Sequence, residues 1–272
     1  MAFLPDLMIL LRSLAFHIAF YGNLIGQMLL FLPVFFLLPE ERCWRIVKNW
    51  ARSSLWILEH VAGVRSKITG LENLPHKGAI IASKHQSFWE TFALIPHLEK
   101  PAFILKKELL HIPVFGWYAK RMRMIPVDRK KRGAVLHSLL GDVRSAIDEG
   151  RQIVIFPEGT RSTPGAQPDY RPGVHFLYAA LDLTIVPVAV NSGLFWPRKA
   201  FRREPGTIRA EFMPAIEPGL ERGPFLERLR EEIEARSLEL LREAFEETPD
   251  LRRSELVAAR LAEMAAGQVR AG

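Results

Sequence analysis

The longest uninterrupted apolar segment of the chain lies close to its N-terminus. Residues 13–39 form a run of 27 residues without Asp, Glu, Lys or Arg, which exceeds the ~20 residues that a helix needs to cross a bilayer. A buried core helix is the alternative, but helices of soluble proteins rarely extend so far without a charge. The run is too long for a cleaved signal peptide, and no cationic cluster precedes it. It therefore predicts a retained membrane helix.

Small and polar residues interrupt this segment, and a second partly apolar run covers residues 50–64. The interruptions are Gly22, Asn23, Gly26, Gln27 and Pro33. The two runs predict a pair of helices that enter the membrane together. The pattern leaves open whether they span the bilayer or insert into one leaflet.

Basic residues are distributed unevenly around the first apolar run. Only Arg12 precedes it, whereas Arg42, Arg45, Lys48 and Arg52 follow it. Because cytoplasmic flanks of membrane helices carry the excess of Lys and Arg, we expect the larger part of the chain to face the cytoplasm at the inner membrane of the cell.

Short apolar, β-branched runs alternate with helical patterns after this region, which is typical of an α/β domain. The predicted strands cover residues 78–82, 102–105, 124–127, 152–156, 184–190 and 207–212. We expect an α/β fold: a mixed sheet flanked by helices, preceded by an N-terminal hydrophobic two-helix membrane motif.

Two helices of the predicted domain are indicated by apolar residues at helical spacing. Val135, Leu139, Val143 and Ile147 share one face of a helix that Gly150 could end. A second stripe runs through a highly charged segment and predicts a surface helix docked on the domain; it consists of Leu226, Leu229, Ile233, Leu240 and Ala244.

The same patterns divide the chain into three regions. We predict a membrane-associated helical region over residues 1–66, an α/β domain over residues 67–220 with its motifs between residues 75 and 195, and a charged helical region over residues 221–272. No internal repeat or long Gly/Ser linker is visible.

Charge and cysteine content narrow the choice of partners. The formal net charge is +7 and the pI is about 9.7, which favours anionic partners. The uncharged N-terminal run favours lipid headgroups as the anionic partner. The basic residues are dispersed and form no recognised nucleic-acid module, which argues against nucleic acid. Cys43 is the single cysteine, so an intrachain disulfide and a multi-thiolate metal site are excluded.

The segment KHQSFWE, residues 84–90, follows a predicted buried strand. If a helix starts near Ser87, Glu90 lies in its first turn and can fold back toward His85. A carboxylate in that position would hold one histidine tautomer and stabilise the imidazolium that forms when His85 takes a proton from an alcohol. The alternative is a capping box, in which Glu90 accepts a hydrogen bond from the Ser87 amide, and the two arrangements can coexist.

The segment FPEGTRS, residues 156–162, also follows a predicted strand. Gly159 allows close backbone approach, Thr160 offers a hydroxyl donor, and Arg161 offers a bidentate fork, which together suit a phosphate. An ordinary turn with a surface ion pair between Glu158 and Arg161 is the alternative. Two weaker motifs are the strand end PVDR, residues 126–129, and the strand segment VPV, residues 186–188.

These motifs together resemble the glycerolipid acyltransferase family, which includes the bacterial 1-acyl-sn-glycerol-3-phosphate (lysophosphatidate) acyltransferases. The resemblance covers about residues 75–195, and FPEGTRS is its most specific part. It implies that His85 and Glu90 form the catalytic dyad, although this family usually has Asp where this chain has Glu90. It also implies phosphate-binding roles for Arg129, Glu158, Gly159, Thr160 and Arg161, with Lys106 as a further candidate, while Pro187 resembles the proline of the fourth motif.

The implied reaction is acyl transfer without a covalent enzyme intermediate. His85 would remove the proton of the lysophosphatidic acid hydroxyl as that oxygen attacks the thioester of acyl-CoA or acyl-carrier protein, which gives phosphatidic acid in phospholipid biosynthesis. The scheme requires no metal or redox cofactor. The alternatives are transfer to another lysolipid or an aminolipid, and a non-catalytic lipid-binding protein of the same fold.

Overall fold

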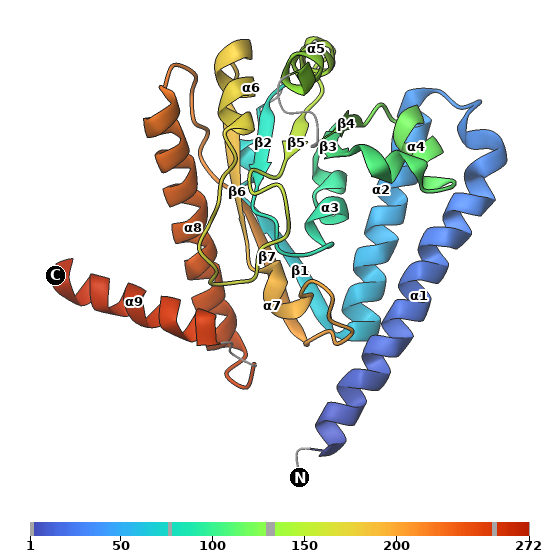
Figure 1. Cartoon of the computed structure of the whole chain (residues 1–272). Helices are drawn as coiled ribbons and strands as arrows, with labels where there is room; N and C mark the ends of the chain where they lie inside the picture. Colours follow the sequence, from blue (N-terminus) through green and yellow to red (C-terminus); the bar gives the residue numbers. More distant parts are fainter. Residues whose placement is uncertain (1–2, 76–77, 129–133, 252–254, 272) are drawn as a thin grey trace.

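The first two helices of the chain form an antiparallel hairpin (Figure 1). We describe a computed structural model that covers residues 3–75, 78–128, 134–251 and 255–271. Helix α1 (Phe3–Phe35) includes a 30-residue segment, Asp6–Phe35, that is long and apolar enough to cross a membrane. Helix α2 (Glu40–Ile57) runs back along it and continues as a π-helical turn, η1 (Leu58–Ala62).

The polar residues that interrupt the apolar run hold this hairpin together. Asn23 Nδ2 donates to the hydroxyl oxygens of Ser53 and Ser54, at 3.0 Å each, and Gln27 Nε2 donates to Ser53 at 3.0 Å. These side chains therefore face the partner helix, where hydrogen bonds offset the loss of their hydration.

The α/β part of the chain is built on a seven-stranded sheet in the order β1-β7-β6-β2-β5-β3-β4. Its strands are β1 (Val64–Thr69), β2 (Ile80–Ser83), β3 (Ala102–Lys106), β4 (Ile125–Val127), β5 (Ile153–Ile155), β6 (Ile185–Val190) and β7 (Gly206–Phe212). All neighbouring strands are parallel except β6 and β7. The sheet is mixed and flanked by helices, as predicted.

Strand β1 was not among the predicted strands. It lies at the edge of the sheet, directly after the hairpin, and alternate residues are exposed or half-buried. Its sequence VRSKIT includes few apolar residues, so it gives a weak strand signal. Pro187, in contrast, lies in β6 in the interior of the sheet rather than at an edge, and its carbonyl accepts a bond from the Met213 amide at 2.9 Å.

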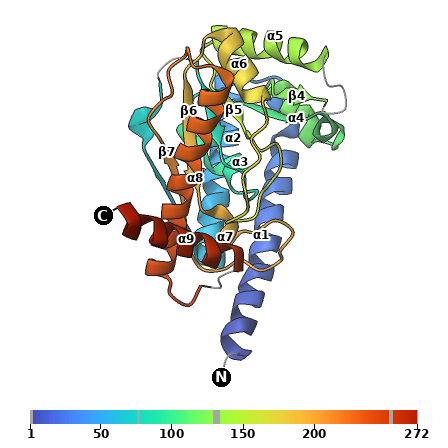
Figure 2. The same ribbon diagram turned by 60° about the vertical axis from the view of Figure 1, so that its left-hand side comes forward.

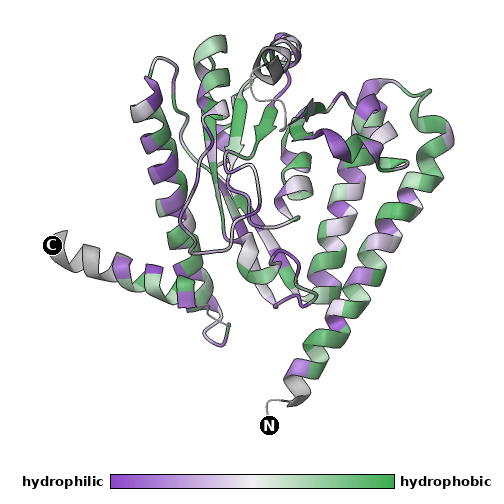
Figure 3. Cartoon of the chain, in the orientation of Figure 1, coloured by the Kyte–Doolittle hydropathy of each residue, from purple (hydrophilic) through white to green (hydrophobic). Residues whose placement is uncertain are grey.

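Helices cover both faces of the sheet, and alternate strand residues point to opposite layers. Ile80 and Ala82 of β2 belong to a core with α5 (Ala134–Asp148), α6 (Gly173–Leu181) and the first half of α8 (Arg222–Glu247). Ile81 belongs to a second core with the N-terminal hairpin, α3 (Glu90–Ala93) and α7 (Ser192–Phe195). The polar outer face of α8 is visible in Figure 3.

The remaining helical segments are short or C-terminal. They are the 3-10 turns η2 (Leu71–Asn73), η3 (Ile95–His97) and η4 (Lys107–His111), helix α4 (Phe115–Arg121), and helix α9 (Glu255–Ala271). Gly150, with φ of 73°, follows the end of α5 as predicted.

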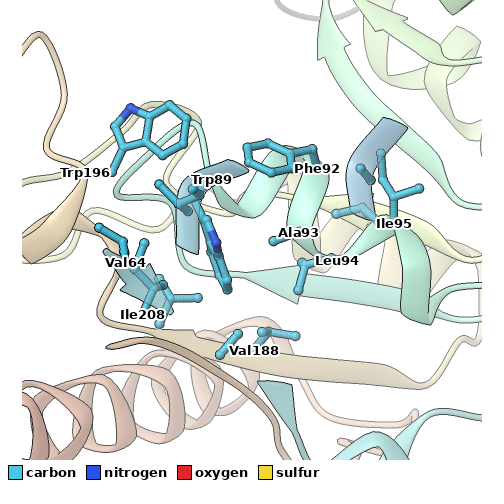
Figure 4. Packing of buried hydrophobic residues seen from close by; sticks show 14 of the residues in the cluster. Val64, Trp89, Phe92, Ala93, Leu94, Ile95, Val188, Trp196 and Ile208 are labelled. Atoms are coloured by element: carbon cyan, nitrogen blue, oxygen red, sulfur yellow. The ribbon is translucent and has the colours of Figure 1, made fainter. Parts of the chain in front are cut away.

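Trp89 anchors the loop after β2 to the sheet. Its fully buried ring points toward strand residues that include Val64, Val188 and Ile208 (Figure 4), and its indole Nε1 donates to Ser66 Oγ at 3.0 Å. The apolar contacts stabilise the loop, and the hydrogen bond satisfies the one polar atom of the ring.

The hairpin is docked on the α/β part near residue 203. The Arg203 guanidinium lies 4.6 Å from the Trp196 ring and 5.8 Å from the Phe16 ring of α1, and the Arg203 amide donates to Ser13 Oγ at 2.9 Å. Burial lowers the pKa of Arg203 to about 10, so the side chain remains cationic at neutral pH. The cation and the aromatic rings therefore hold α1 against the sheet layer.

A second buried arginine, Arg151, joins the segments around β3, β4 and β5. Its guanidinium donates to four backbone carbonyls, those of Lys100, Pro101, Met122 and Arg123, at 2.9–3.2 Å. The Arg151→Met variant should lose about 2–4 kcal/mol of unfolding free energy, since these buried acceptors would lose a charged donor. Denaturant unfolding in detergent measures this loss. The exposed Arg144→Met variant on α5 is the matched control, with an expected change within about 0.5 kcal/mol.

Candidate active site

Two sequence motifs meet at the carboxyl ends of two central strands of the sheet. Strands β2 and β5 are parallel neighbours, with Ile80 paired to Ile153 and Ala82 to Ile155. KHQSFWE follows the carboxyl end of β2 and FPEGTRS follows that of β5. Loops at the carboxyl ends of parallel strands are where α/β proteins form their sites. The structure therefore brings the two motifs side by side.

The Glu90 carboxylate is the centre of the first loop. Its Oε1 accepts hydrogen bonds from His85 Nδ1 at 3.0 Å, from the Gln86 amide at 2.5 Å and from the Ser87 amide at 2.6 Å. Its Oε2 accepts from Ser192 Oγ at 2.8 Å. The residue is completely buried. The expected His85 contact and the expected Ser87 amide contact thus exist together on one oxygen.

The local backbone explains how a glutamate reaches this position. Helix α3 begins at Glu90, not near Ser87, and a turn precedes it in which the Trp89 amide donates to Ser87 Oγ at 3.1 Å. Because the turn bends the backbone before the helix starts, the longer side chain of Glu90 folds back to both the His85 ring and the preceding amides.

This contact decides which nitrogen of His85 is free. A carboxylate only accepts hydrogen bonds, so the proton of the neutral ring lies on Nδ1 and the lone pair lies on Nε2. The side chain is 15% exposed, and its ring stacks on Phe156 with centroids 4.0 Å apart and planes at 18°. Position and tautomer therefore suit Nε2 for taking a proton from a bound hydroxyl.

The backbone of His85 is also held by the second loop. The His85 amide donates to Glu158 Oε1 at 2.9 Å, and the His85 carbonyl accepts from the Ser162 amide at 2.8 Å. The FPEGTRS segment therefore holds the loop that carries His85. These contacts support a positioning role for Glu158, which differs from the predicted phosphate contact, and a carboxylate would in any case repel a phosphate.

Lys84 links the FPEGTRS segment to helix α8. Its ammonium lies 2.5 Å from Glu234 Oε1 and 3.7 Å from Glu158 Oε2, and the lysine side chain is 4% exposed. Tyr170 donates its hydroxyl proton to Glu234 at 3.0 Å. Burial and the nearby carboxylates of Glu234 and Glu158 raise the pKa of Tyr170 well above its ordinary value, so the phenol remains a neutral donor.

The described members of the predicted phosphate-binding set lie near the carboxyl ends of β5 and β3. Gly159 has a φ of 68°, which favours glycine. Thr160 is exposed and Arg161 half-buried, and Lys106 is exposed at the carboxyl end of β3, two strands from β2. Arg129 lies outside the described residues. Arg198 adds an unpredicted cation, since its Nη1 donates to Thr160 Oγ1 at 3.4 Å.

Several residues of the site could not be identified from the sequence. Ser192 lies 102 positions from Glu90 and Glu234 lies 150 from Lys84, so no local pattern links them. Lys84 and Phe156 were within the motifs, but their roles depend on contacts between distant segments. Among the described residues, no group of three or more His, Cys, Asp or Glu side chains could hold a metal ion.

Comparison with known proteins supports the resemblance seen in the motifs. A family profile described as acyltransferase matches residues 65–191. The 1-acyl-sn-glycerol-3-phosphate acyltransferase of Pseudomonas aeruginosa is 38% identical over 181 residues, which cover 66% of this chain and 70% of that protein. The chain belongs to the acyltransferase family. The Saccharomyces cerevisiae enzyme of the same name is a more distant acyltransferase, 28% identical over 52% of this chain and 48% of its own length.

A solved acyltransferase shares the fold. The crystal structure of the 1-acyl-sn-glycerophosphate acyltransferase from Thermotoga maritima superposes with a TM-score of 0.69, covering 86% of this chain and 97% of that one, at 22% identity. The predicted family and the predicted fold class are thus confirmed. The predicted roles of individual site residues remain predictions, because none of the comparisons tests them.

The cluster of Lys84, Glu158 and Glu234 predicts a specific pattern of stability. The Lys84→Met variant leaves two carboxylates close together without their shared cation, so we expect a loss of about 2–4 kcal/mol of unfolding free energy. The double variant Lys84→Met/Glu234→Gln removes one of those charges and should recover part of the loss. Denaturant unfolding of the unaltered protein, Lys84→Met, Glu234→Gln and the double variant measures the coupling energy between Lys84 and Glu234. A double variant no more stable than Lys84→Met would contradict the ion-pair network.

Proposed function

We propose that this acyltransferase moves a fatty acyl group from acyl-CoA or acyl-carrier protein to the free hydroxyl of 1-acyl-sn-glycerol-3-phosphate. The observation that carries the proposal is the contact between His85 Nδ1 and the buried Glu90 carboxylate, which leaves Nε2 as a base. The P. aeruginosa and S. cerevisiae relatives bear the name of this activity. The product would be phosphatidic acid for phospholipid synthesis.

The reaction follows from the order of bond changes. The acceptor hydroxyl loses its proton to His85 Nε2 as its oxygen attacks the thioester carbonyl carbon, and a tetrahedral intermediate forms. The C–S bond then breaks, the ester forms, and the imidazolium returns the proton to the leaving thiolate. Glu90 stabilises the imidazolium in both steps, because its carboxylate already accepts from Nδ1.

The phosphate of the acceptor would bind on the FPEGTRS side of the base. Arg161 offers two parallel donors for phosphate oxygens, and Lys106 extends the positive charge toward β3. We assign Arg129 to the same phosphate from its motif alone. Gly159 and Thr160 would bring backbone and hydroxyl donors close to the same group. These contacts fix the hydroxyl relative to Nε2, and such positioning accounts for a large part of the rate of a bimolecular reaction. No metal or redox cofactor enters the scheme.

The hairpin supports a membrane location for the acyltransferase, and its docking favours insertion into one leaflet. Contacts between α1 and the α/β part extend from Ser13, bound to Arg203, to Met28, whose carbonyl accepts from Tyr118 at 2.7 Å. If α1 crossed the bilayer, the segments of the α/β part around Arg203 and Tyr118 that contact it would lie in hydrocarbon. The basic residues after α1 favour the cytoplasmic face of the inner membrane.

The first test removes the proposed base and its partner separately. His85→Ala should lower kcat by about 10²–10⁴-fold, and Glu90→Gln should also lower it, because an amide stabilises the imidazolium less well than a carboxylate. Turnover of lysophosphatidic acid with acyl-CoA and with acyl-carrier protein measures both effects. The exposed His60→Ala variant is the control and should retain activity. Full activity in the His85→Ala variant would refute the dyad.

The second test addresses the acceptor. Arg161→Gln should raise KM for lysophosphatidic acid by about 10- to 100-fold, the value of a lost charge-assisted hydrogen bond, with little change for a monoacylglycerol that lacks the phosphate. The matched control is Arg171→Gln. Arg171 is exposed, lies in the same loop between β5 and α6, and forms an ion pair with Asp169. Equal loss with both acceptors, or equal rates of the unaltered protein with both, would favour another lysolipid or an aminolipid as the natural acceptor.

A further inference from the structure

A mixed aromatic and cationic surface lies where the hairpin turns. We call it the tip surface and define it by five residues: Phe36, Leu37, Trp117, Lys120 and Arg121. Leu37 is 83% exposed and Trp117 is 51% exposed. Phe36, Trp117, Lys120 and Arg121 line one open cavity of about 570 Å³, so the aromatic and cationic groups form one continuous surface. The proposed reaction uses none of them.

Helix α4 is fixed rigidly to the end of the membrane helix. The Tyr118 ring packs on Phe35 with centroids 4.1 Å apart, and its hydroxyl donates to the Met28 carbonyl at 2.7 Å. Arg121 Nη2 donates to the Leu38 carbonyl at 2.6 Å. Figures 1 and 2 both show α4 beside the upper end of α1. Whatever holds α1 therefore also sets the position of α4.

The composition of the tip surface matches the boundary between hydrocarbon and water. Trp117, Lys120 and Arg121 share one face of α4, since they are three and four residues apart. Tryptophan prefers the level of the lipid headgroups. Lys and Arg can lay their aliphatic stems along apolar groups while their charged ends reach the headgroups. The surface is also continuous with the apolar exposed end of α1, which includes Leu29, Leu30 and Val34.

We propose that the tip surface binds anionic phospholipid headgroups at the bilayer interface, as a lipid contact separate from the catalytic site. The proposal rests on the membrane location given under the proposed function. Continuity with α1 identifies the occupant as a bilayer lipid, and the two cations identify its headgroup as anionic. In this arrangement Trp117 lies at the level of the headgroups while Lys120 and Arg121 contact their phosphates.

The experiment uses the full chain in vesicles and a probe on α4. Phe115→Cys in a Cys43→Ser background places a single thiol on α4 and leaves the tip surface intact; a polarity-sensitive dye on this thiol is quenched by nitroxide-labelled headgroups when α4 reaches them. Arg222→Cys, exposed at the start of α8, carries the same dye as the matched control. We expect strong quenching at position 115 in vesicles that contain phosphatidylglycerol, and little at position 222.

Two further variants test the chemistry of the contact. Lys120→Gln should weaken the preference for phosphatidylglycerol over phosphatidylcholine about fivefold, the effect of one cation near an anionic surface, and Trp117→Gln should reduce quenching in both lipids. Quenching at position 115 no greater than at position 222 would overturn the proposal and leave the surface to a protein partner. Equal quenching in both lipids, unaffected by Lys120→Gln, would overturn the anionic specificity. Neither readout requires turnover, so a failed acyltransferase assay would concern the proposed function alone.

Discussion

A buried carboxylate organises the centre of this protein. Glu90 has no exposed surface, and its two oxygens accept four hydrogen bonds, from the His85 ring, two successive amides and the Ser192 hydroxyl. Burying an anion without hydrogen-bond partners would cost more free energy than a folded protein has to spare. Because the turn after β2 and the start of α7 both supply donors, the charge is stabilised only in the folded arrangement. The position and tautomer of His85 follow from that requirement.

The rest of the site is arranged around the same loop in successive layers. Glu158 holds the His85 amide, Lys84 holds Glu158, and Glu234 holds Lys84 from helix α8. Glu158 and Glu234 come from segments that are distant from residue 84 in the sequence, so helix α8 contributes to the geometry of a site that begins near residue 84. Lys84, Glu158 and Glu90 are buried, so the loss of one of these charges weakens the contacts that the others make.

Much of the fold could be predicted from the sequence, because its signals are local. Each of these patterns indicates its element without reference to distant residues. They are the uncharged run at residues 13–39, the β-branched runs of six strands, and the apolar stripe of α8. Strand β1 gave no such signal, since it is an edge strand with alternating polar residues. The site was predicted in part: His85, Glu90 and Arg161 stand in local motifs, whereas Ser192, Tyr170 and Glu234 come to the site only through the tertiary fold. Helix α3 begins at Glu90 rather than near Ser87, because the turn at Ser87 takes up the capping contacts first.

The contact between Ser13 and Arg203 bears on how the protein is made. The two residues are 190 positions apart, and a chain is synthesised and folds from its N-terminal end. Helix α1 therefore leaves the ribosome long before Arg203, Trp196 or Phe201 exists to cover its inner side. With the membrane location proposed above, lipid would be the available apolar environment for Phe16 and Phe20 during that interval. Insertion would then precede docking, and the α/β part would assemble against a helix that the bilayer already holds.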